Sequence, residues 1–273
     1  MPFAAAVTNT RSDRVGGLRR LVTRAGRDRA GEHLVEGPQA CREAVRFAAE
    51  RVRDVYVTEA AQTRWPEIVD DALARGLYVH PTSPEVMVKI SEDAQGVVLV
   101  LRDVVAPAGE VDLAVVVAGA RLVALCEEVR DPGNAGTIIR AADAAGADAV
   151  VLTSGSVDVR SPKVVRSSAG SLFHLPVVTG VALADAVATL RAAGLTILAA
   201  DGGGADDVET SPLLARPTAW IFGTEAQGLS DDARELADAV VAVPLRGRAE
   251  SLNVAMAATV CLYASSRVHA SQA

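Results

Sequence analysis

Short apolar runs alternate with amphipathic segments along most of the chain. In the N-terminal part the apolar runs predict strands, and segments with an apolar residue at every third or fourth position predict helices. The expected strands are residues 32–37, 52–60, 77–81 and 96–101. The expected helices are residues 14–26, 38–50, 64–76 and 83–92. This pattern indicates a small α/β domain.

The alternation resumes in the C-terminal part with strands that are apolar on both faces. The expected strands are residues 121–128, 148–153, 195–200, 218–223 and 239–244. The expected helices are residues 134–146, 183–194, 230–238 and 251–267. Apolar strands separated by helices predict a mostly parallel sheet that is covered on both sides. Such sheets bind ligands at the carboxyl ends of their strands, so we expect the chemistry in the loops that follow them.

The two alternating regions predict two domains, residues 14–103 and residues 119–273. Residues 104–118 lose the periodicity and contain proline and glycine, so they are expected to form a linker. Residues 1–13 are expected to be a flexible N-terminus.

Composition limits the class of protein. Of the 273 residues, 50% are hydrophobic and 22% are charged, so the chain can bury a sizeable core. No apolar run approaches the roughly 20 residues of a membrane-spanning helix, and the N-terminus lacks the pattern of a secretion signal. Cys41, Cys126 and Cys261 lie far apart and match no metal-ligand spacing. We therefore expect a cytoplasmic protein with reduced thiols, no metal and no membrane partner.

The charge distribution leaves two interpretations open. The net charge of −7 argues against a nucleic-acid partner, but residues 11–29 contain seven arginines and only two acids. A second group of cations lies at residues 160–166. Each group is either a solvated surface or a site for phosphates, whose oxygens suit the planar guanidinium. The candidate phosphate contacts are Arg19, Arg20, Arg24, Arg27, Arg29, Arg160, Lys163 and Arg166.

A glycine-containing loop follows the expected strand at residues 218–223. Gly223 and Gly228 enclose Thr224 and Glu225, and glycines let a ligand approach the backbone closely. The loop lacks the lysine of a phosphate-binding P-loop, and no Gly-x-Gly-x-x-Gly follows the first strand. An enzyme that uses a nicotinamide cofactor is therefore disfavoured. Residues 201–207 also contain glycines, but their acids would repel phosphate, so we interpret them as a flexible loop.

Polar residues near two helix starts have ordinary structural interpretations as well. Asn134 can cap its helix, and Arg140 can pair with Asp143 on the surface. Ser251 can cap the last helix, which leaves Asn253 exposed in its first turn. The buried face of that helix is expected to contain Val254, Ala257, Ala258, Cys261 and Leu262.

Taken together and in order, four segments resemble the SpoU (TrmH-like) family of RNA 2′-O-ribose methyltransferases, within the SPOUT superfamily. They are residues 134–147, 166–177, 222–230 and 243–260. Residues 14–103 are more loosely similar to the small substrate-binding domain that precedes the catalytic domain in many members. The resemblance implies a deep trefoil knot in the C-terminal domain, an exception to the rule that chains are unknotted. It also implies that residues 243–252 line the methyl-donor pocket and that the last helix packs across a homodimer interface.

The resemblance further implies the cofactor, S-adenosylmethionine, and the residues that surround it. Gly223, Val243 and Leu252 match positions whose backbone holds the methyl donor, and Thr224 and Gly228 belong to the same loop. The matched catalytic positions are Asn134, Arg140, Glu225, Ser251 and Asn253. Arg140 is expected to orient the target nucleotide electrostatically, with Asn134 and Glu225 orienting Arg140.

The function implied is methylation of a ribose 2′-hydroxyl in structured RNA, with 23S ribosomal RNA favoured. The two groups of cations then become candidate RNA contacts. Because only 3% of residues are aromatic, recognition of RNA shape is favoured over base stacking on aromatic side chains. Two alternatives stay open: methylation of tRNA, and a non-catalytic RNA-binding factor in ribosome assembly.

Overall fold

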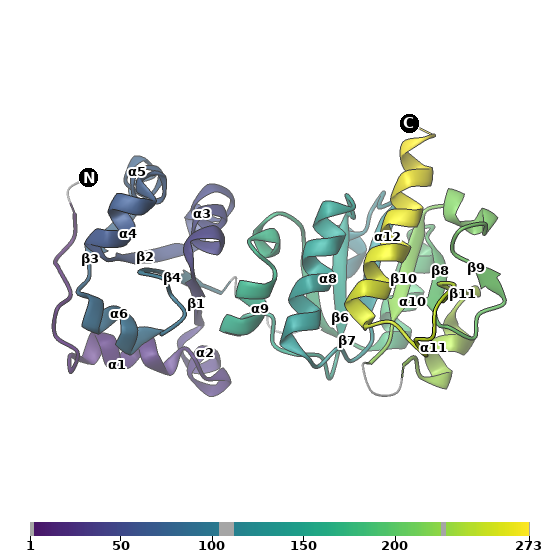
Figure 1. The fold of residues 1–273 in the computed structure, drawn as a ribbon, viewed down its shortest axis with the longest axis horizontal. Coiled ribbons are helices and arrows are strands. Elements are labelled where there is room, and N and C mark those ends of the chain that lie inside the picture. Colours follow the sequence, from purple (N-terminus) through teal and green to yellow (C-terminus); the bar gives the residue numbers. More distant parts are fainter. Residues whose placement is uncertain (1–2, 104–111, 225–227, 273) are drawn as a thin grey trace. The chain divides into compact units, whose positions relative to one another are not determined.

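The computed structural model describes residues 3–103, 112–224 and 228–272 (Figure 1). The chain forms two compact units. The N-terminal unit contains Met1–Val105 and Asp158–His174, and the C-terminal unit contains Ala106–Val157 and Leu175–Ala273. The sequence pattern assigned Asp158–His174 to the second domain, whereas their packing groups them with the first.

The N-terminal unit is built on a four-stranded sheet with the order β1-β4-β2-β3. Its strands are β1 (Glu32–Glu36), β2 (Val52–Val57), β3 (Tyr78–Pro81) and β4 (Val97–Arg102). Strand β4 is antiparallel to both β1 and β2, and β3 is parallel to β2. The helices are α1 (Asp13–Arg20), α2 (Arg24–Ala30), α3 (Pro38–Phe47), α4 (Glu59–Arg64), α5 (Pro66–Ala74), α6 (Pro84–Ile90) and α9 (Pro162–Ser167), with 3₁₀ turns η1 (Ala49–Arg51) and η2 (Ser171–Phe173). Apolar residues of α3 and α5 cover one face of the sheet, and those of α1 and α6 cover the other.

Two features at the start of this unit differ from the predictions. The helix expected at residues 14–26 is two helices, because Thr23 accepts a hydrogen bond from the Gly26 amide (3.1 Å) and begins α2. The sharp turn requires glycine, since a Cβ at Gly26 would lie 1.8 Å from the Arg20 carbonyl oxygen. The N-terminus, expected to be flexible, is held along β3: the amides of Ala4 and Val7 donate to the carbonyls of Val79 (2.9 Å) and Pro81 (2.8 Å).

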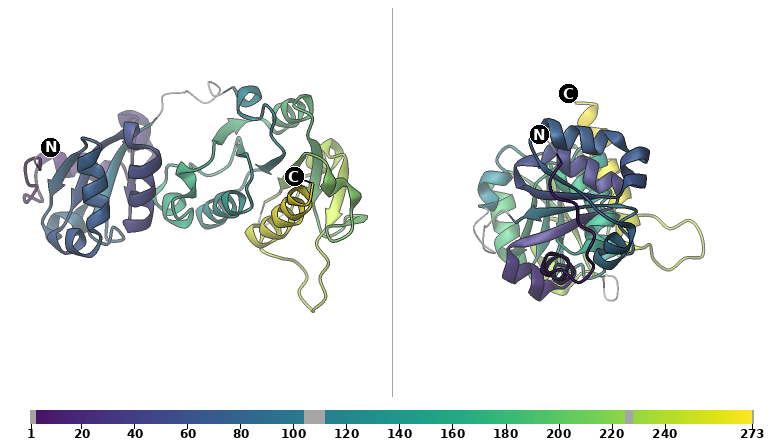
Figure 2. Two further views of the ribbon diagram at one scale, coloured as in Figure 1. Left: turned by 90° about the horizontal axis from the view of Figure 1, so that it is seen from above. Right: turned by 90° about the vertical axis from the view of Figure 1, so that its left-hand side faces the viewer.

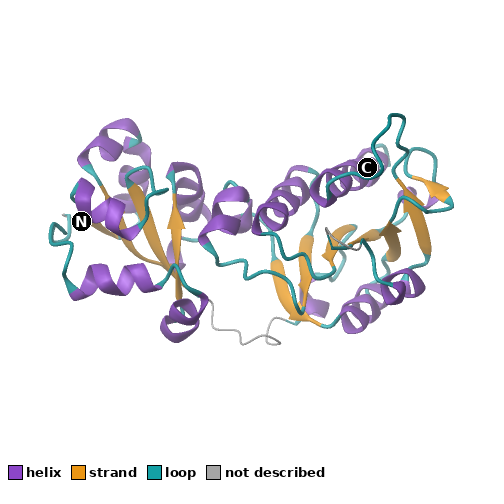
Figure 3. Cartoon of the chain, turned by 60° about the horizontal axis from the view of Figure 1, so that its bottom comes forward, coloured by secondary structure: helices purple, strands orange, loops and turns teal. Residues whose placement is uncertain are grey.

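The C-terminal unit contains a seven-stranded sheet in the order β7-β6-β5-β10-β8-β11-β9, in which every pairing is parallel. Figure 3 shows strands of this sheet in orange and helices beside them in purple. Its strands are β5 (Leu122–Cys126), β6 (Ala149–Thr153), β7 (Val177–Val181), β8 (Thr196–Ala200), β9 (Asp206–Asp207), β10 (Thr218–Phe222) and β11 (Ala239–Ala242). The helices are α7 (Leu113–Val116), α8 (Pro132–Ala144), α10 (Leu183–Ala192), α11 (Asp231–Leu236) and α12 (Val254–Ala270), with the 3₁₀ turn η3 (Pro212–Ala215). The predicted parallel sheet with a small preceding α/β domain is therefore confirmed.

Two strands of this sheet were not predicted. Strand β7 carries Thr179 and Gly180 in its centre, which interrupt the apolar run. Strand β9 lies inside the segment interpreted as a flexible loop, where a Cβ at Gly204 would be 2.7 Å from the Val240 carbonyl oxygen. That glycine allows close packing against β11. Of the expected linker, residues 104–111 lie outside the described residues, and Leu113 and Val117 are buried in the core of the C-terminal unit.

The sheet is covered by helices on both faces. Helices α8 and α12 pack against each other and over β5 and β10, while α7, α10 and α11 cover the opposite face. The Trp220 side chain is fully buried, and its indole N–H donates to Ser265 Oγ on α12 (2.9 Å). Helix α12 thus follows β11 in sequence but returns over the middle of the sheet, a path consistent with the expected trefoil knot. In the described part of the chain, no helix combines the length and the apolar character needed to cross a bilayer.

A network of charges fixes Asp158–His174 to the rest of the N-terminal unit. Arg27, only 3% exposed, donates to Asp158 through Nε (3.1 Å) and Nη2 (2.8 Å). Arg160 donates to Asp158 (2.9 Å) and to Asp103 (2.7 Å), which also bonds the buried His33 (2.6 Å). Burial alone would raise the pKa of Asp158, but the hydrogen bonds from Arg160 and Arg27 outweigh it and lower the pKa to about 2. The ionised carboxylate therefore stabilises the fold.

We expect acid to weaken this attachment. Because the pKa of Asp158 is lower in the folded state, its contribution is complete at neutral pH and is lost as the pH falls from about 4 towards 2, a change of about 2 kcal/mol. Asp158→Asn should remove that pH dependence and lower the free energy of unfolding at pH 7 by about 3–5 kcal/mol, since Arg27 stays buried. Urea unfolding of the full chain across this pH range measures both effects.

Asp28→Asn is the control, because Asp28 also bonds Arg160 (2.6 Å) but is exposed. Removal of its charge should cost no more than about 1 kcal/mol. An equal loss of stability in the two variants would contradict the role given to Asp158.

Candidate active site

The site predicted from the sequence lies at one edge of the parallel sheet. Strands β5, β10, β8 and β11 run in the same direction, so their carboxyl ends meet at that edge. The loops that follow β5, β10 and β11 carry most of the predicted catalytic and methyl-donor residues. Residues 243–253, after β11, extend away from the sheet (Figure 2), and all of residues 245–253 are exposed.

Two predicted residues that are far apart in sequence are in contact. The Asn253 Nδ2 donates to Asn134 Oδ1 at 3.0 Å. The Asn253 Oδ1 meanwhile accepts from the amides of Ala255 (3.0 Å) and Met256 (3.3 Å), so Asn253 is the N-cap of α12. One side chain therefore begins the last helix and joins it to the first turn of α8.

These contacts correct two capping assignments. Asp131, not Asn134, caps α8, because its carboxylate accepts from the Asn134 amide at 2.8 Å. Ser251 does not cap α12 and lies exposed two residues before the cap. Proline at the first helical position explains the earlier start of α8, since Pro132 already has helical φ and needs no amide partner. On α12, Ala258, Cys261 and Leu262 are buried as expected, together with Ala255, whereas Val254 and Ala257 are half-buried.

The loop after β10 is closed by its own backbone. The Thr224 amide donates to the Gly228 carbonyl (2.9 Å), and the Gly228 amide donates back to Thr224 (3.1 Å). A Cβ at Gly223 would lie 2.2 Å from the Gly228 oxygen, and Gly228 has φ +69°. Both glycines are therefore required by the turn itself, whether or not a ligand approaches. Glu225 lies outside the described residues.

Glu127 is a structural residue of the site that the sequence reasoning missed. Its carboxylate, 8% exposed, accepts the Ser230 amide (3.2 Å) and the Ser230 hydroxyl, and its own amide donates to the Phe222 carbonyl (2.8 Å). It thereby ties the loop after β10 to the end of β5. A glutamate placed directly after an entirely apolar strand is the signal that could have identified it.

The remaining predicted residues of the C-terminal unit are more exposed. Arg140 lies six residues after Asn134, about 9 Å further along α8, and its side chain is exposed. Among the described residues, none forms a hydrogen bond or ion pair with its guanidinium. Leu252 is 39% exposed, and Val243 is half-buried at the end of β11. The structure brings Asn134 and Asn253 together but does not enclose Val243 and Leu252.

The predicted RNA-binding cations divide into two groups. Arg27 and Arg160 are part of the charge network around Asp158, and the Arg166 guanidinium contacts the buried Glu36 carboxylate and Asp93 (3.0 Å). These three guanidinium groups are used within the fold. The other candidates have exposed side chains on α1, α2 and α9, namely Arg19, Arg20, Arg24, Arg29 and Lys163.

Comparison with protein families and known proteins agrees with this arrangement. Residues 121–263 match the SpoU rRNA Methylase family, and residues 34–104 match the family described as RNA 2′-O ribose methyltransferase substrate binding. The chain is 33% identical over 260 residues to the 23S rRNA (guanosine(2553)-2′-O)-methyltransferase RlmP of Bacillus subtilis, and the match covers 94% of this chain and 97% of that protein.

Two solved structures share the fold along almost the full length. The SpoU methyltransferase AviRb from Streptomyces viridochromogenes, in complex with the cofactor AdoMet, gives a TM-score of 0.78 at 33% identity and covers 96% of this chain and 99% of that chain. The AdoMet-bound rRNA methyltransferase from Sinorhizobium meliloti gives a TM-score of 0.80 at 28% identity and covers 97% and 98%.

The role of Glu127 can be tested through the mobility of the loop that it holds. Glu127→Ala leaves the Ser230 amide and hydroxyl unpaired, so we expect a destabilisation of about 1–3 kcal/mol and faster amide exchange at residues 228–230. Hydrogen–deuterium exchange with mass spectrometry measures this. Glu235→Ala, which removes an exposed carboxylate from α11, is the matched control. Unchanged exchange in Glu127→Ala would show that the loop does not depend on this hydrogen bonding.

Proposed function

The chain belongs to the SpoU rRNA methylase family, and we propose that it transfers the methyl group of S-adenosylmethionine to a ribose 2′-hydroxyl of 23S ribosomal RNA. The observation that carries the proposal is the hydrogen bond between Asn253 and Asn134. It joins the first and last family segments beside the ends of the parallel strands, where sheets of this kind bind their ligands.

Ribosomal RNA is favoured over tRNA by the relatives that match almost the whole chain. The Bacillus protein is named for 23S rRNA, and the N-terminal unit matches a substrate-binding family of 2′-O-methyltransferases. Such a substrate implies that the protein works in the cytoplasm. A non-catalytic assembly factor is disfavoured because the polar residues of the family, including Asn134, Arg140, Ser251 and Asn253, are all present.

The residues of the site fit the proposed cofactor. Gly223, Val243 and Leu252 would hold it through backbone groups, next to the turn that Gly223 and Gly228 form. The loop after β11 also carries two apolar side chains, Leu245 and Leu252, each 39% exposed. Exposed leucines on a ligand-binding loop suit the adenine ring and the carbon chain of the donor. When bound, S-adenosylmethionine supplies a methyl carbon activated by its sulfonium group.

In the proposed mechanism the protein mainly aligns the ribose and stabilises its charge. Arginine side chains keep their positive charge in proteins, so the proton of the 2′-hydroxyl would pass to water, which reaches the exposed Arg140 and the exposed residues 245–253. The positive charge of Arg140 can stabilise the negative charge that develops on the ribose oxygen, or hold the adjacent phosphate through two N–H groups. Asn134, held by Asn253, and the exposed Ser251 hydroxyl can orient the reacting groups. Alignment of this kind supplies much of the acceleration when one reactant is already activated.

Two substitutions of Arg140 distinguish the contribution of its positive charge to kcat from the contribution of its planar guanidinium. Arg140→Ala should lower kcat about 100-fold or more, because a donor aimed at developing charge is removed. Arg140→Lys keeps the charge but loses the planar fork, so we expect only partial activity. Transfer of tritiated methyl groups to ribosomal RNA measures kcat, and calorimetry with S-adenosylhomocysteine should show unchanged donor binding.

Arg130→Ala is the control, because it removes an exposed arginine from the loop before α8. Wild-type turnover in Arg140→Lys would contradict the fork-dependent part of the mechanism.

The exposed face of α12 supports a homodimer as part of the proposal. Three apolar side chains follow the helical repeat along α12, namely Met256, Val260 and Tyr263, which are 58%, 41% and 49% exposed. The opposite face of the helix is buried against the sheet. Exposed apolar side chains at helical spacing on one helix are typical of a protein–protein contact, and a second copy of the chain would cover them through its own α12.

Charges on this face should disrupt the dimer. Met256→Asp combined with Val260→Asp should convert a dimer to a monomer, because two carboxylates would be buried without partners. Light scattering coupled to size exclusion measures the mass. Val115→Asp, which changes a 72% exposed valine on α7, is the matched control. A wild-type mass in the double variant, or a monomeric wild type, would contradict the proposed interface.

A further inference from the structure

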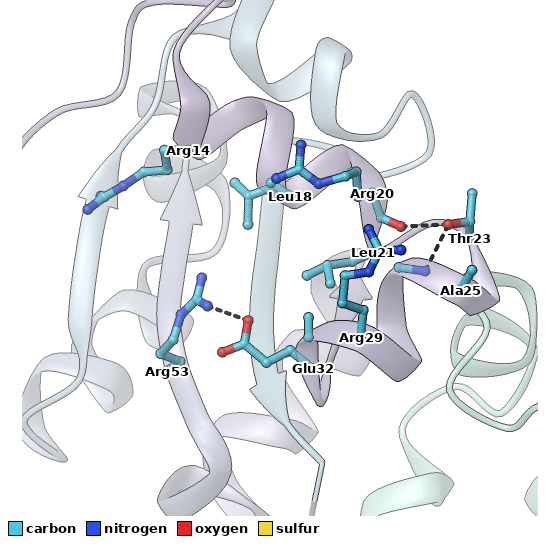
Figure 4. Close-up of a pocket in the computed structure, with 12 residues that line it drawn as sticks. Arg14, Leu18, Arg20, Leu21, Thr23, Ala25, Arg29, Glu32 and Arg53 are labelled. Atoms are coloured by element: carbon cyan, nitrogen blue, oxygen red, sulfur yellow. Dashed lines mark hydrogen bonds and ion pairs between the residues drawn. The ribbon is translucent and has the colours of Figure 1, made fainter.

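A hollow of about 520 Å³ lies in the N-terminal unit, between helices α1 and α2 and strands β1 and β2 (Figure 4). This volume falls within the roughly 300–1,000 Å³ that small-molecule sites usually have. Of the residues that line it, only Arg53 falls within residues 34–104, which match the substrate-binding family. The hollow is therefore formed mainly by a part of the chain to which the family match assigns no role.

The rim of the hollow carries four arginines and one acid. Arg53 pairs with Glu32 and with Asp54 (2.7 Å), and Arg14 contacts the His80 ring (3.2 Å). Arg20 and Arg29 are exposed, and no residue in the described ranges pairs with either guanidinium. Figure 4 shows both extending from the adjoining helices beside the hollow. Two positive charges therefore remain available to an anion.

The inner surface of the hollow is formed by apolar side chains and, at a glycine, by bare backbone. Leu18 and Leu21 are 2% and 3% exposed and form its buried part. Gly17 lies in the middle of α1, where glycine destabilises a helix relative to alanine. A Cβ there would meet only the Arg20 guanidinium, at 3.8 Å, so close packing does not require that glycine. Gly26, in contrast, is required by the turn before α2. The bare backbone at Gly17 keeps open a space that an ordinary side chain would fill.

We infer that this hollow binds one unstacked nucleotide of the RNA substrate. Its phosphate would lie at Arg20 and Arg29, and its base or ribose would lie against Leu18, Leu21 and the backbone of Gly17. Guanidinium groups suit phosphate oxygens and also stack on bases, and single-stranded RNA exposes both. A double helix presents phosphates on a convex surface and has no need of a cavity. The inference rests on the proposed function, because it takes RNA as the substrate.

Binding of a labelled oligonucleotide tests the hollow directly. The probe is a fluorescein-labelled single-stranded RNA of about twelve nucleotides, with a hairpin duplex of equal length beside it, and fluorescence anisotropy reports the Kd at several salt concentrations. Arg20→Ala with Arg29→Ala should weaken binding of the single strand about tenfold or more. It should also reduce the slope of log K against log salt by about 0.7 for each phosphate that is no longer bound. The hairpin should be affected less.

A second test fills the hollow with a side chain and leaves the charge of its rim unchanged. Gly17→Leu adds a side chain that favours helix, so its thermal midpoint should not fall. We expect it to weaken single-strand binding at least fivefold while the salt slope stays unchanged. Arg64→Ala with Arg75→Ala removes two exposed arginines from the same unit outside the hollow and should change the Kd less than twofold.

Two outcomes would overturn the inference. Wild-type affinity in Gly17→Leu would show that the cavity is not used. Equal weakening in the two double arginine variants would show that only the general positive field binds RNA. Methyl transfer by the wild-type protein is measured separately: if it methylates no RNA, the proposed function fails, and the oligonucleotide data still decide whether the hollow binds a nucleotide.

Discussion

The position of β10 between β5 and β8 is the constraint on which the C-terminal unit depends. The strand is late in the sequence, yet it pairs in parallel with both neighbours, and every one of its side chains is buried, including the large rings of Trp220 and Phe222. Because of this insertion, the loops after β5 and β10 become neighbours, and Glu127 can join them. Helix α12 must then return over the same strand, where Ser265 satisfies the buried indole of Trp220. That return brings Asn253 to Asn134.

The N-terminal unit uses arginine in two different ways, and burial determines which way. Arg27 is almost fully buried, so its charge is tolerated only because Asp158 and two carbonyl oxygens accept hydrogen bonds from its guanidinium nitrogens. Arg20 on α1 and Arg29 on α2, the helix that also carries Arg27, are exposed and carry no such compensation. A basic stretch that looks uniform in sequence therefore contains both a structural cation and cations that are available to bind phosphate. The interpretation of this stretch as one uniform surface, whether solvated or anion-binding, does not hold for Arg27.

The sequence could predict those helices and strands that are marked by a local pattern of apolar residues. Continuous runs such as β5, β6 and β10 were identified because the side chains in them are buried, whereas β7 and β9 lack that pattern and were not. The break between α1 and α2 was missed because Leu18, Leu21 and Val22 continue the helical repeat across it, and only the close approach at Gly26 forces the turn.

Contacts between distant polar residues leave no periodic signal in the sequence. The pairing of Arg27 with Asp158, 131 positions away, could not be read from spacing. The resemblance to a family predicted Asn134 and Asn253 as site residues, but it did not predict their direct hydrogen bond.

The chain passes between the two units more than once, and this bears on how the proposed reaction could use substrate binding. The N-terminal unit is joined to the C-terminal unit at three places, because Asp158–His174 leave the large sheet after β6 and return before β7. The charge network around Asp158 holds that segment in the N-terminal unit. In the proposed function, an RNA segment held by the N-terminal unit would be connected through the chain to the unit that carries Arg140, and this would raise the effective concentration of the target ribose there. Binding energy from nucleotides remote from the reacting hydroxyl can in this way be used for alignment, which is the main requirement of a reaction whose methyl donor is already activated.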